Sequence, residues 1–187
     1  MKKLIFTLLL SSAVVSGLMA QTEKGNVLWG ANVGNIQLDF QKGSTQFGID
    51  LNPKIGYFIQ DRLAIGPEVT IGFHTTSGDD IFNYGVGAFG RYYLYKGEAE
   101  VSNNSRWFIE ANAGINGVNT GGSNTNGLGL GIGPGVAYFL NKNVALEALL
   151  KYNFTAGFGN STTANRLGLG VGFQIYLPGK ALRDRLK

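Results

Sequence analysis

Residues 127–136 read GLGLGIGPGV, with glycine at every odd position and leucine, isoleucine, proline or valine at every even one. Strict alternation over this length has the period of a β-strand, in which successive side chains point to opposite faces. Such a strand presents bulk on one face and almost nothing on the other. The fold therefore has to contain a sheet face on which glycine is useful.

The same alternation recurs along the chain, as in LAIGPEVTIGFHT (63–75) and RLGLGVGFQIYL (166–177). No apolar stretch after residue 20 approaches the ~20 residues of a transmembrane helix. The first strand needs a bulge near Gly34–Asn35 to keep its apolar face consistent. The eight predicted strands are 27–40, 46–59, 63–75, 82–95, 106–117, 127–140, 144–155 and 165–177.

Short and long connections alternate between these strands. Prolines at 53, 67 and 134 fall inside strands, where the missing N–H predicts local bulges. Segment 96–105 breaks the alternation of short and long connections, because a tight turn is expected there and the segment is too long for one. Tight turns are predicted at 60–62 and 141–143, and longer polar loops at 76–81, 118–126 and 156–164.

Two kinds of eight-stranded barrel fit this pattern, a soluble one with an apolar interior and a membrane one with an apolar exterior. The lumen of an eight-stranded barrel is only just wide enough for side chains, so a glycine-rich face belongs inside. On an exterior facing water, the same glycines would weaken the strands without benefit. The apolar face therefore points outward, and the sequence predicts an eight-stranded antiparallel up-and-down transmembrane β-barrel.

Aromatic residues are expected to form two girdles at the edges of the apolar band, as in outer-membrane barrels. They are Trp29, Tyr57, Tyr92, Trp107, Tyr138 and Phe173 at one rim, and Phe40, Phe47, Phe73, Tyr84, Tyr152 and Phe154 at the other.

The ends of the chain differ from the middle. Residues 1–20 have a basic start, an apolar stretch and a small residue, Ala20, and are predicted to be a cleaved signal peptide. The barrel is assigned to 21–177 and a basic periplasmic tail to 178–187. Once Lys2, Lys3 and the tail are set aside, the formal charge of +4 falls to about −1, which leaves no basic face for nucleic acid.

The predicted inner face carries charges among its glycines. Five of them, Lys54, Glu68, Arg91, Glu110 and Glu147, lie about four to six residues from a predicted periplasmic turn. Together with Lys151 they are expected to form a salt-bridge plug across the lumen, since unpaired buried charges cost several kcal/mol each. Two alternatives remain, namely independent groups wetted by water and a gate that opens when pairs exchange. The network residues are Lys54, Glu68, Arg91, Glu110, Glu147 and Lys151; Asp39, Asp50 and Arg166 are also placed on the inner face.

No catalytic, metal or cofactor site is predicted. His74 is the only histidine, and Ser77, Asp79 and Asp80 follow it. These residues share one connection, whereas a catalytic triad usually converges from separate segments. Cysteine is absent, which excludes disulfides and thiolate metal sites.

The signal peptide, the eight alternating segments and the turn pattern resemble the small outer-membrane β-barrel family, of the OmpA-barrel and OmpX kind. The resemblance covers 27–177 and implies periplasmic termini, location in the bacterial outer membrane, and contact with lipid, lipopolysaccharide and the outer-membrane assembly machinery. Members often end on an aromatic residue, whereas here ten residues follow Leu177. No peptidoglycan-binding domain is expected after the barrel either.

The favoured function is a monomeric, non-enzymatic barrel with a closed lumen and a structural or surface-interaction role. Three alternatives stay open: a narrow low-conductance channel, a lipid-modifying enzyme that uses His74, and a soluble ligand-binding barrel.

Overall fold

The computed structural model describes residues 20–41, 44–75, 80–94, 104–158 and 163–179, with side chains except those of 20 and 35–47. The predicted signal peptide, apart from Ala20, and most of the basic tail therefore lie outside the described residues. No helix in the described part of the chain is long and apolar enough to cross a membrane.

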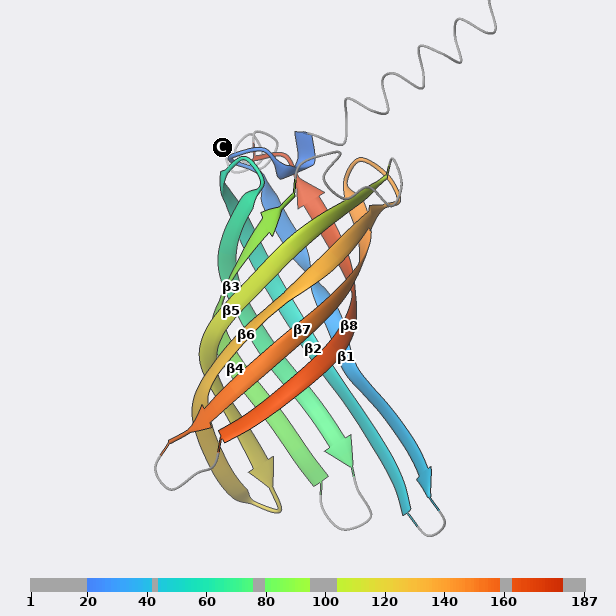
Figure 1. Ribbon diagram of the computed structural model, residues 1–187, viewed down its shortest axis with the longest axis vertical. Helices are drawn as coiled ribbons and strands as arrows, with labels where there is room; N and C mark the ends of the chain where they lie inside the picture. The colour runs from blue at the N-terminus through green and yellow to red at the C-terminus, as the bar shows by residue number, and fades with distance from the viewer. Residues whose placement is uncertain (1–19, 42–43, 76–79, 95–103, 159–162, 180–187) are drawn as a thin grey trace, which may run out of the picture.

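The described residues form eight antiparallel strands in sequence order around a closed barrel (Figure 1). The first and last strands pair with each other, from Val27 opposite Leu177 to Gly34 opposite Gly170, so the sheet has no free edge there. The predicted fold class is confirmed. The strands are β1 (Val27–Gln41), β2 (Ser44–Gln60), β3 (Leu63–Thr75), β4 (Asp80–Tyr93), β5 (Ser105–Thr120), β6 (Ser123–Phe139), β7 (Val144–Gly157) and β8 (Thr163–Leu177).

Irregularities occur at fewer places than the sequence suggests. The β1–β2 register shifts between Gly34 and Gln37, which confirms the predicted bulge. The bulges predicted at the prolines are wrong. Around Pro53, the residue pairs between β2 and β3 stop at Leu51–Ile71 and resume at Lys54–Glu68 in the same register. A proline therefore removes hydrogen bonds to one neighbouring strand without inserting a residue.

The long polar loop predicted at 118–126 is also wrong. Strands β5 and β6 extend into this segment and pair as far as Thr120 opposite Ser123. Only Gly121 and Gly122 remain between them, with φ of 55° and 89°. Two consecutive positive φ angles are those of the tight hairpin turn that glycine favours, so a Gly-Gly pair replaces the expected loop.

The two faces of the sheet differ as the glycine pattern predicts. Outward side chains are exposed, with Leu130 at 44% and Leu169 at 65%, whereas inward Arg91 and Glu110 are at 0%. The sequence pattern alone suggests an empty glycine face, but side chains of neighbouring strands occupy part of it. A Cβ at Gly129 would meet the Asn116 amide, and one at Gly135 would meet the Phe108 ring. These two glycines make room for side chains of the neighbouring strand β5.

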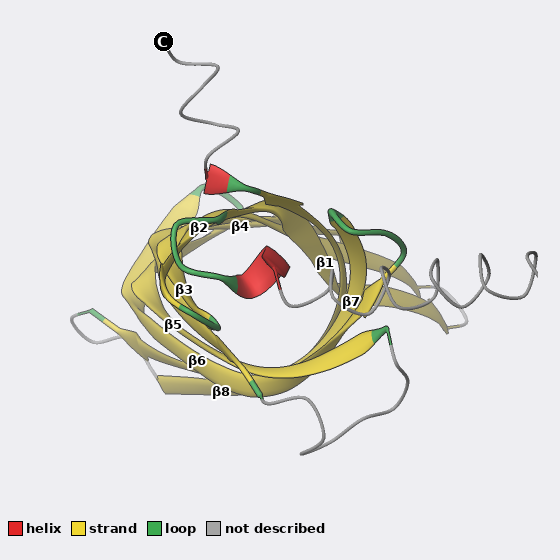
Figure 2. Ribbon diagram, turned by 90° about the horizontal axis from the view of Figure 1, so that it is seen from above, coloured by secondary structure: helices red, strands yellow, loops and turns green. Residues whose placement is uncertain are grey.

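Both ends of the described chain lie at one end of the barrel. A short 3-10 helix, η1 (Ala20–Thr22), precedes β1. Seen along the barrel axis, η1 sits over the opening enclosed by the strands (Figure 2). Gln21 and Thr22 are buried there. The N-terminal segment thus covers one mouth of the lumen, which we call the near mouth.

Candidate functional site

The lumen contains the candidate site, because the structure brings the six predicted charged side chains together there. They come from five strands, and three are positive and three negative. The ion-pair layer consists of Lys54 (β2), Glu68 (β3), Arg91 (β4), Glu110 (β5), Glu147 and Lys151 (both β7).

Glu110 is the centre of this layer because it contacts all three cations. Its Oε1 lies 2.7 Å from Lys54 Nζ and 3.1 Å from Lys151 Nζ. Its Oε2 accepts hydrogen bonds from Arg91 Nη2 at 2.6 Å and Nε at 3.0 Å. One carboxylate therefore connects β2, β4 and β7 across the lumen to its own strand β5.

Two further carboxylates complete the layer. Glu68 lies 2.6 Å from Lys54 Nζ through its Oε2 and 3.7 Å from Lys151 Nζ through its Oε1. Glu147 accepts a hydrogen bond from Arg91 Nη1 at 2.7 Å. Lys54–Glu68 and Arg91–Glu110 are direct cross-strand pairs, whereas the other contacts cross the barrel. Every charge in the layer has at least one opposite partner.

Burial makes this pairing necessary. Lys54, Glu68 and Glu147 are 2–4% exposed, and only Lys151 has a partly accessible side chain, at 14%. Removing one partner of a buried pair typically costs about 3–5 kcal/mol, because it leaves an uncompensated charge. The layer therefore keeps its members fixed as a group.

Aromatic side chains fill the lumen between the ion-pair layer and the near mouth. Tyr93 and Tyr176 join the two regions, because their hydroxyl groups lie 2.6 Å apart and Tyr176 donates to Glu147 Oε1 at 3.0 Å. The Arg91 guanidinium lies 4.0 Å from the centre of the Phe108 ring, a cation–π contact. The aromatic layer consists of Phe58, Tyr93, Phe108, Phe139 and Tyr176, each at most 1% exposed.

On the other side of the ion-pair layer the lumen widens into a cavity of about 430 Å³, here called the vestibule. Glu68 and Lys151 form part of its lining, and Asn112 Nδ2 donates to Glu68 Oε1 at 3.0 Å. Arg166 also lines it and is exposed. Uncharged polar groups of the lining include Asn32, Asn52, Thr70, Asn83, Asn112, Asn116, Thr125 and Asn153.

His74 pairs with a carboxylate on the neighbouring strand. Its Nε2 lies 2.9 Å from Asp50 Oδ1, on the adjacent strand β2, and both side chains are largely buried. Ser77 and Asp79 lie outside the described residues, as does the side chain of Asp39, and Asp80 is exposed. No group of three or more metal-ligating side chains occurs within the described ranges.

Sequence reasoning missed the tyrosine hydroxyls and Asn112 as partners of the charged layer. All three residues share the inward alternation of the charges on their strands, so the signal was present. The missing information was the height of each residue in the barrel. That height depends on the stagger between strands, which alternation does not contain.

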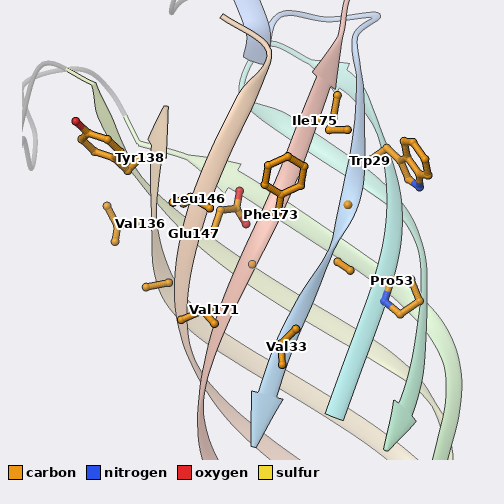
Figure 3. A pocket seen from close by; sticks show the side chains of 14 residues that line it. Trp29, Val33, Pro53, Val136, Tyr138, Leu146, Glu147, Val171, Phe173 and Ile175 are labelled. Atoms are coloured by element: carbon orange, nitrogen blue, oxygen red, sulfur yellow. The ribbon is translucent and has the colours of Figure 1, made fainter. Parts of the chain in front are cut away.

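The outer surface carries the apolar band. Figure 3 shows Trp29 and Val33 of β1 together with Val171, Phe173 and Ile175 of β8. These side chains line an apolar groove of about 880 Å³. Ala31 and Ala148 line it between larger side chains, which explains the depression. Girdle residues such as Trp29, Tyr57 and Tyr138 are 48–53% exposed. A water-soluble protein rarely exposes a continuous apolar surface of this kind.

Comparisons with known proteins add the fold relationship. No protein-family model matches the sequence, and a search of curated proteins finds no match either. Neisserial surface protein A has a similar structure, with a TM-score of 0.59 and 19% sequence identity over 83% of this chain and 97% of that one. The fold is that of the small outer-membrane β-barrels. The N-terminal barrel domain of Pseudomonas aeruginosa OprF is also similar, with a TM-score of 0.56 and 13% sequence identity over 82% of this chain and 98% of that one.

Proposed function

We propose that this protein is an integral barrel of the bacterial outer membrane with a closed lumen and a structural or surface-interaction role. It is exported by a signal peptide, residues 1–20, which is removed after Ala20. Residues 21–177 form the barrel, and 178–187 form a basic tail in the periplasm. The proposal assigns the protein no catalytic role and no cofactor.

The observation that carries the proposal is the inversion of polarity across the sheet. Large apolar side chains are exposed on the outside, including Ile132 at 55% and Leu167 at 67%, while Arg91 and Glu110 are fully buried inside. Exposed apolar area costs roughly 25 cal/mol per Å² in water, and this cost disappears in a hydrocarbon environment. A surface of this kind is suited to lipid.

Three stacked features of the lumen support a closed barrel over an open pore. They are η1 at the near mouth, the aromatic layer behind it and the ion-pair layer behind that. Ions would have to displace paired charges and packed rings to pass. The vestibule ends at the ion-pair layer and opens away from the termini, a position from which it can meet external molecules.

The proposed partners follow from this placement. The outer face contacts outer-membrane lipid and lipopolysaccharide, and the outer-membrane assembly machinery inserts the barrel. Because lipid covers the whole apolar band of one chain, no second copy is needed to bury it, and we propose a monomer.

Cell fractionation combined with gel mobility tests the architecture. We expect the protein in the outer-membrane fraction and a folded form whose mobility changes on boiling, because a closed barrel resists detergent until heated. Recovery of folded, monodisperse protein from buffer without detergent would overturn the proposal.

A further inference from the structure

The vestibule exposes positive charge to an entering molecule and shields its negative charge. Lys151 and Arg166 both line it; 14% of the lysine side chain is accessible, and the arginine is exposed. Two acids also line it, but only 4% of the Glu68 side chain and 8% of the Asp50 side chain are accessible. Glu68 belongs to the ion-pair layer, and Asp50 is paired with His74. The accessible charge in the vestibule is therefore positive.

The two cations lie on the same face of neighbouring strands. In the β7–β8 register Lys151 is opposite Gly168, and Asn153 is opposite Arg166. Arg166 is thus the diagonal neighbour of Lys151, at a distance of about 7–8 Å within the sheet, which long side chains can bridge. The glycine at position 168 places no side chain between them. One anion in the vestibule can therefore contact both cations.

Both cations have donors left for a ligand. Within the part of the chain that the structure describes, the Arg166 side chain has no ion pair or hydrogen bond. Its planar guanidinium carries N–H donors in a fork that matches a carboxylate. The Lys151 ammonium group has three donors, and it contacts two carboxylates, Glu110 at 3.1 Å and Glu68 at 3.7 Å. At least one lysine donor therefore remains for the vestibule.

Strands β4 and β5 contribute uncharged hydrogen-bonding groups across the lumen from β8. Asn83 (β4) and Asn116 (β5) line the vestibule, and neither side-chain amide has a hydrogen-bond partner among the described residues. Asn116 is opposite Gly85, two residues from Asn83, so the two amides are diagonal neighbours as well. A Cβ at Gly85 would meet the Asn116 Oδ1 atom, so the glycine makes room for this amide. An amide both donates and accepts, as a ligand hydroxyl group does.

We propose that the vestibule binds a sugar acid, a small molecule with one carboxylate and several hydroxyl groups. The carboxylate pairs with Arg166 and Lys151, and the hydroxyl groups bond to the amides of Asn83 and Asn116. The cavity of about 430 Å³ falls within the roughly 300–1,000 Å³ of small-molecule sites. This inference rests on the closed lumen of the proposed function and names the ligand class of its outer cavity.

Calorimetric titration of the purified barrel in a nonionic detergent tests the ligand class with three probes. Glucuronate carries both the carboxylate and the hydroxyl groups, glucose lacks the carboxylate, and acetate lacks the hydroxyl groups. Glucuronate should bind about tenfold or more tightly than either of the others, the factor expected for the lost hydrogen bonds to charged or amide groups. Absence of glucuronate binding, or equal binding of glucuronate and glucose, would overturn the inference.

Arg166→Gln tests the residue that carries the proposal. It should weaken glucuronate binding by about tenfold or more, and it should fold, because Arg166 is exposed and lies outside the ion-pair layer. Lys142→Gln is the matched control, since it removes the same charge from an exposed residue in the turn between β6 and β7. It should bind glucuronate like the unaltered protein. An equal loss in both variants would show an effect of net charge alone and contradict the site.

Sugar acids reach the vestibule either as free molecules or as part of a lipopolysaccharide chain, and a competition experiment distinguishes these sources. Lipopolysaccharide that displaces glucuronate from the unaltered protein would identify its own acidic sugars as the ligand, whereas undisturbed binding would identify free sugar acids. The heat-shifted gel band of each sample separates this inference from the proposed function. A folded outer-membrane barrel that does not bind glucuronate overturns the sugar-acid site alone, and protein that folds without detergent overturns the proposed function.

Discussion

Arg91 and Glu110 lie directly opposite each other on β4 and β5, and two guanidinium nitrogens of Arg91 donate to one oxygen of Glu110, at 2.6 and 3.0 Å. The other oxygen of Glu110 is thereby left for Lys54 and Lys151. Arg91 in turn reaches Glu147 on the far side of the lumen. This cross-strand pair is the point through which the ion-pair layer spans the barrel.

Neutralising Glu110 should therefore destabilise the barrel more than any surface change. Glu110→Gln retains the shape of the side chain but leaves three cations facing an uncharged amide. We expect a loss of about 3–5 kcal/mol, the usual cost of breaking a buried pair. Denaturant unfolding in detergent measures it. Asp80→Asn, at an exposed strand end, is the control and should unfold like the unaltered protein. Equal midpoints for both variants would contradict the role of the layer.

Planar bilayers test the closed lumen. The unaltered protein should show no discrete current steps, because the ion-pair and aromatic layers both obstruct the path. Arg91→Ala should also stay silent, since Phe58, Tyr93 and Tyr176 remain packed behind it. Discrete openings of the unaltered protein would favour the channel alternative. Openings that appear only in Arg91→Ala would identify the ion-pair layer as a gate.

Two glycines of β6 provide a matched test of how the lumen is packed. A Cβ at Gly131 would meet the amide ends of Asn112 and Asn153, which can rotate away. A Cβ at Gly133 would meet the Leu150 carbonyl and the Lys151 Cα at 2.8 Å, which are backbone atoms and cannot. Gly133→Ala should therefore give less folded barrel, by the heat-shifted gel band, than Gly131→Ala. Similar yields would contradict the close approach of β6 and β7.

The lipid-facing assignment predicts that charge is costly at mid-strand. Leu130→Arg should lose about 2–4 kcal/mol of folding free energy in lipid vesicles, the range for arginine near the middle of a bilayer. Ser123→Arg, beside the β5–β6 turn, should lose at most about 1 kcal/mol, as residues near the interface do. Equal losses would indicate that Leu130 does not face hydrocarbon.

Much of the fold could be predicted because alternation fixes which face each side chain occupies. The eight strands, the bulge after Gly34 and the inward direction of the six charges all follow from parity. The extent of the β5–β6 hairpin did not follow, because Asn and Thr at 118–126 resemble a loop in composition while the Gly121–Gly122 pair permits a two-residue turn.

Contacts across the lumen could not be predicted in the same way. Lys54 meets Glu110 although β2 and β5 are not neighbours, and His74 pairs with Asp50 on the adjacent strand β2. Such contacts depend on barrel closure and on stagger, which are properties of the whole sheet.

The direct test of the central claim uses the absence of cysteine, which lets a single nitroxide label be attached anywhere. We would label Leu130→Cys in lipid vesicles and measure how strongly oxygen, which concentrates in hydrocarbon, and a water-soluble nickel complex each relax the label. The account predicts strong relaxation by oxygen and little by nickel. Strong relaxation by nickel, or by neither reagent, would place residue 130 in water or inside the barrel and contradict it.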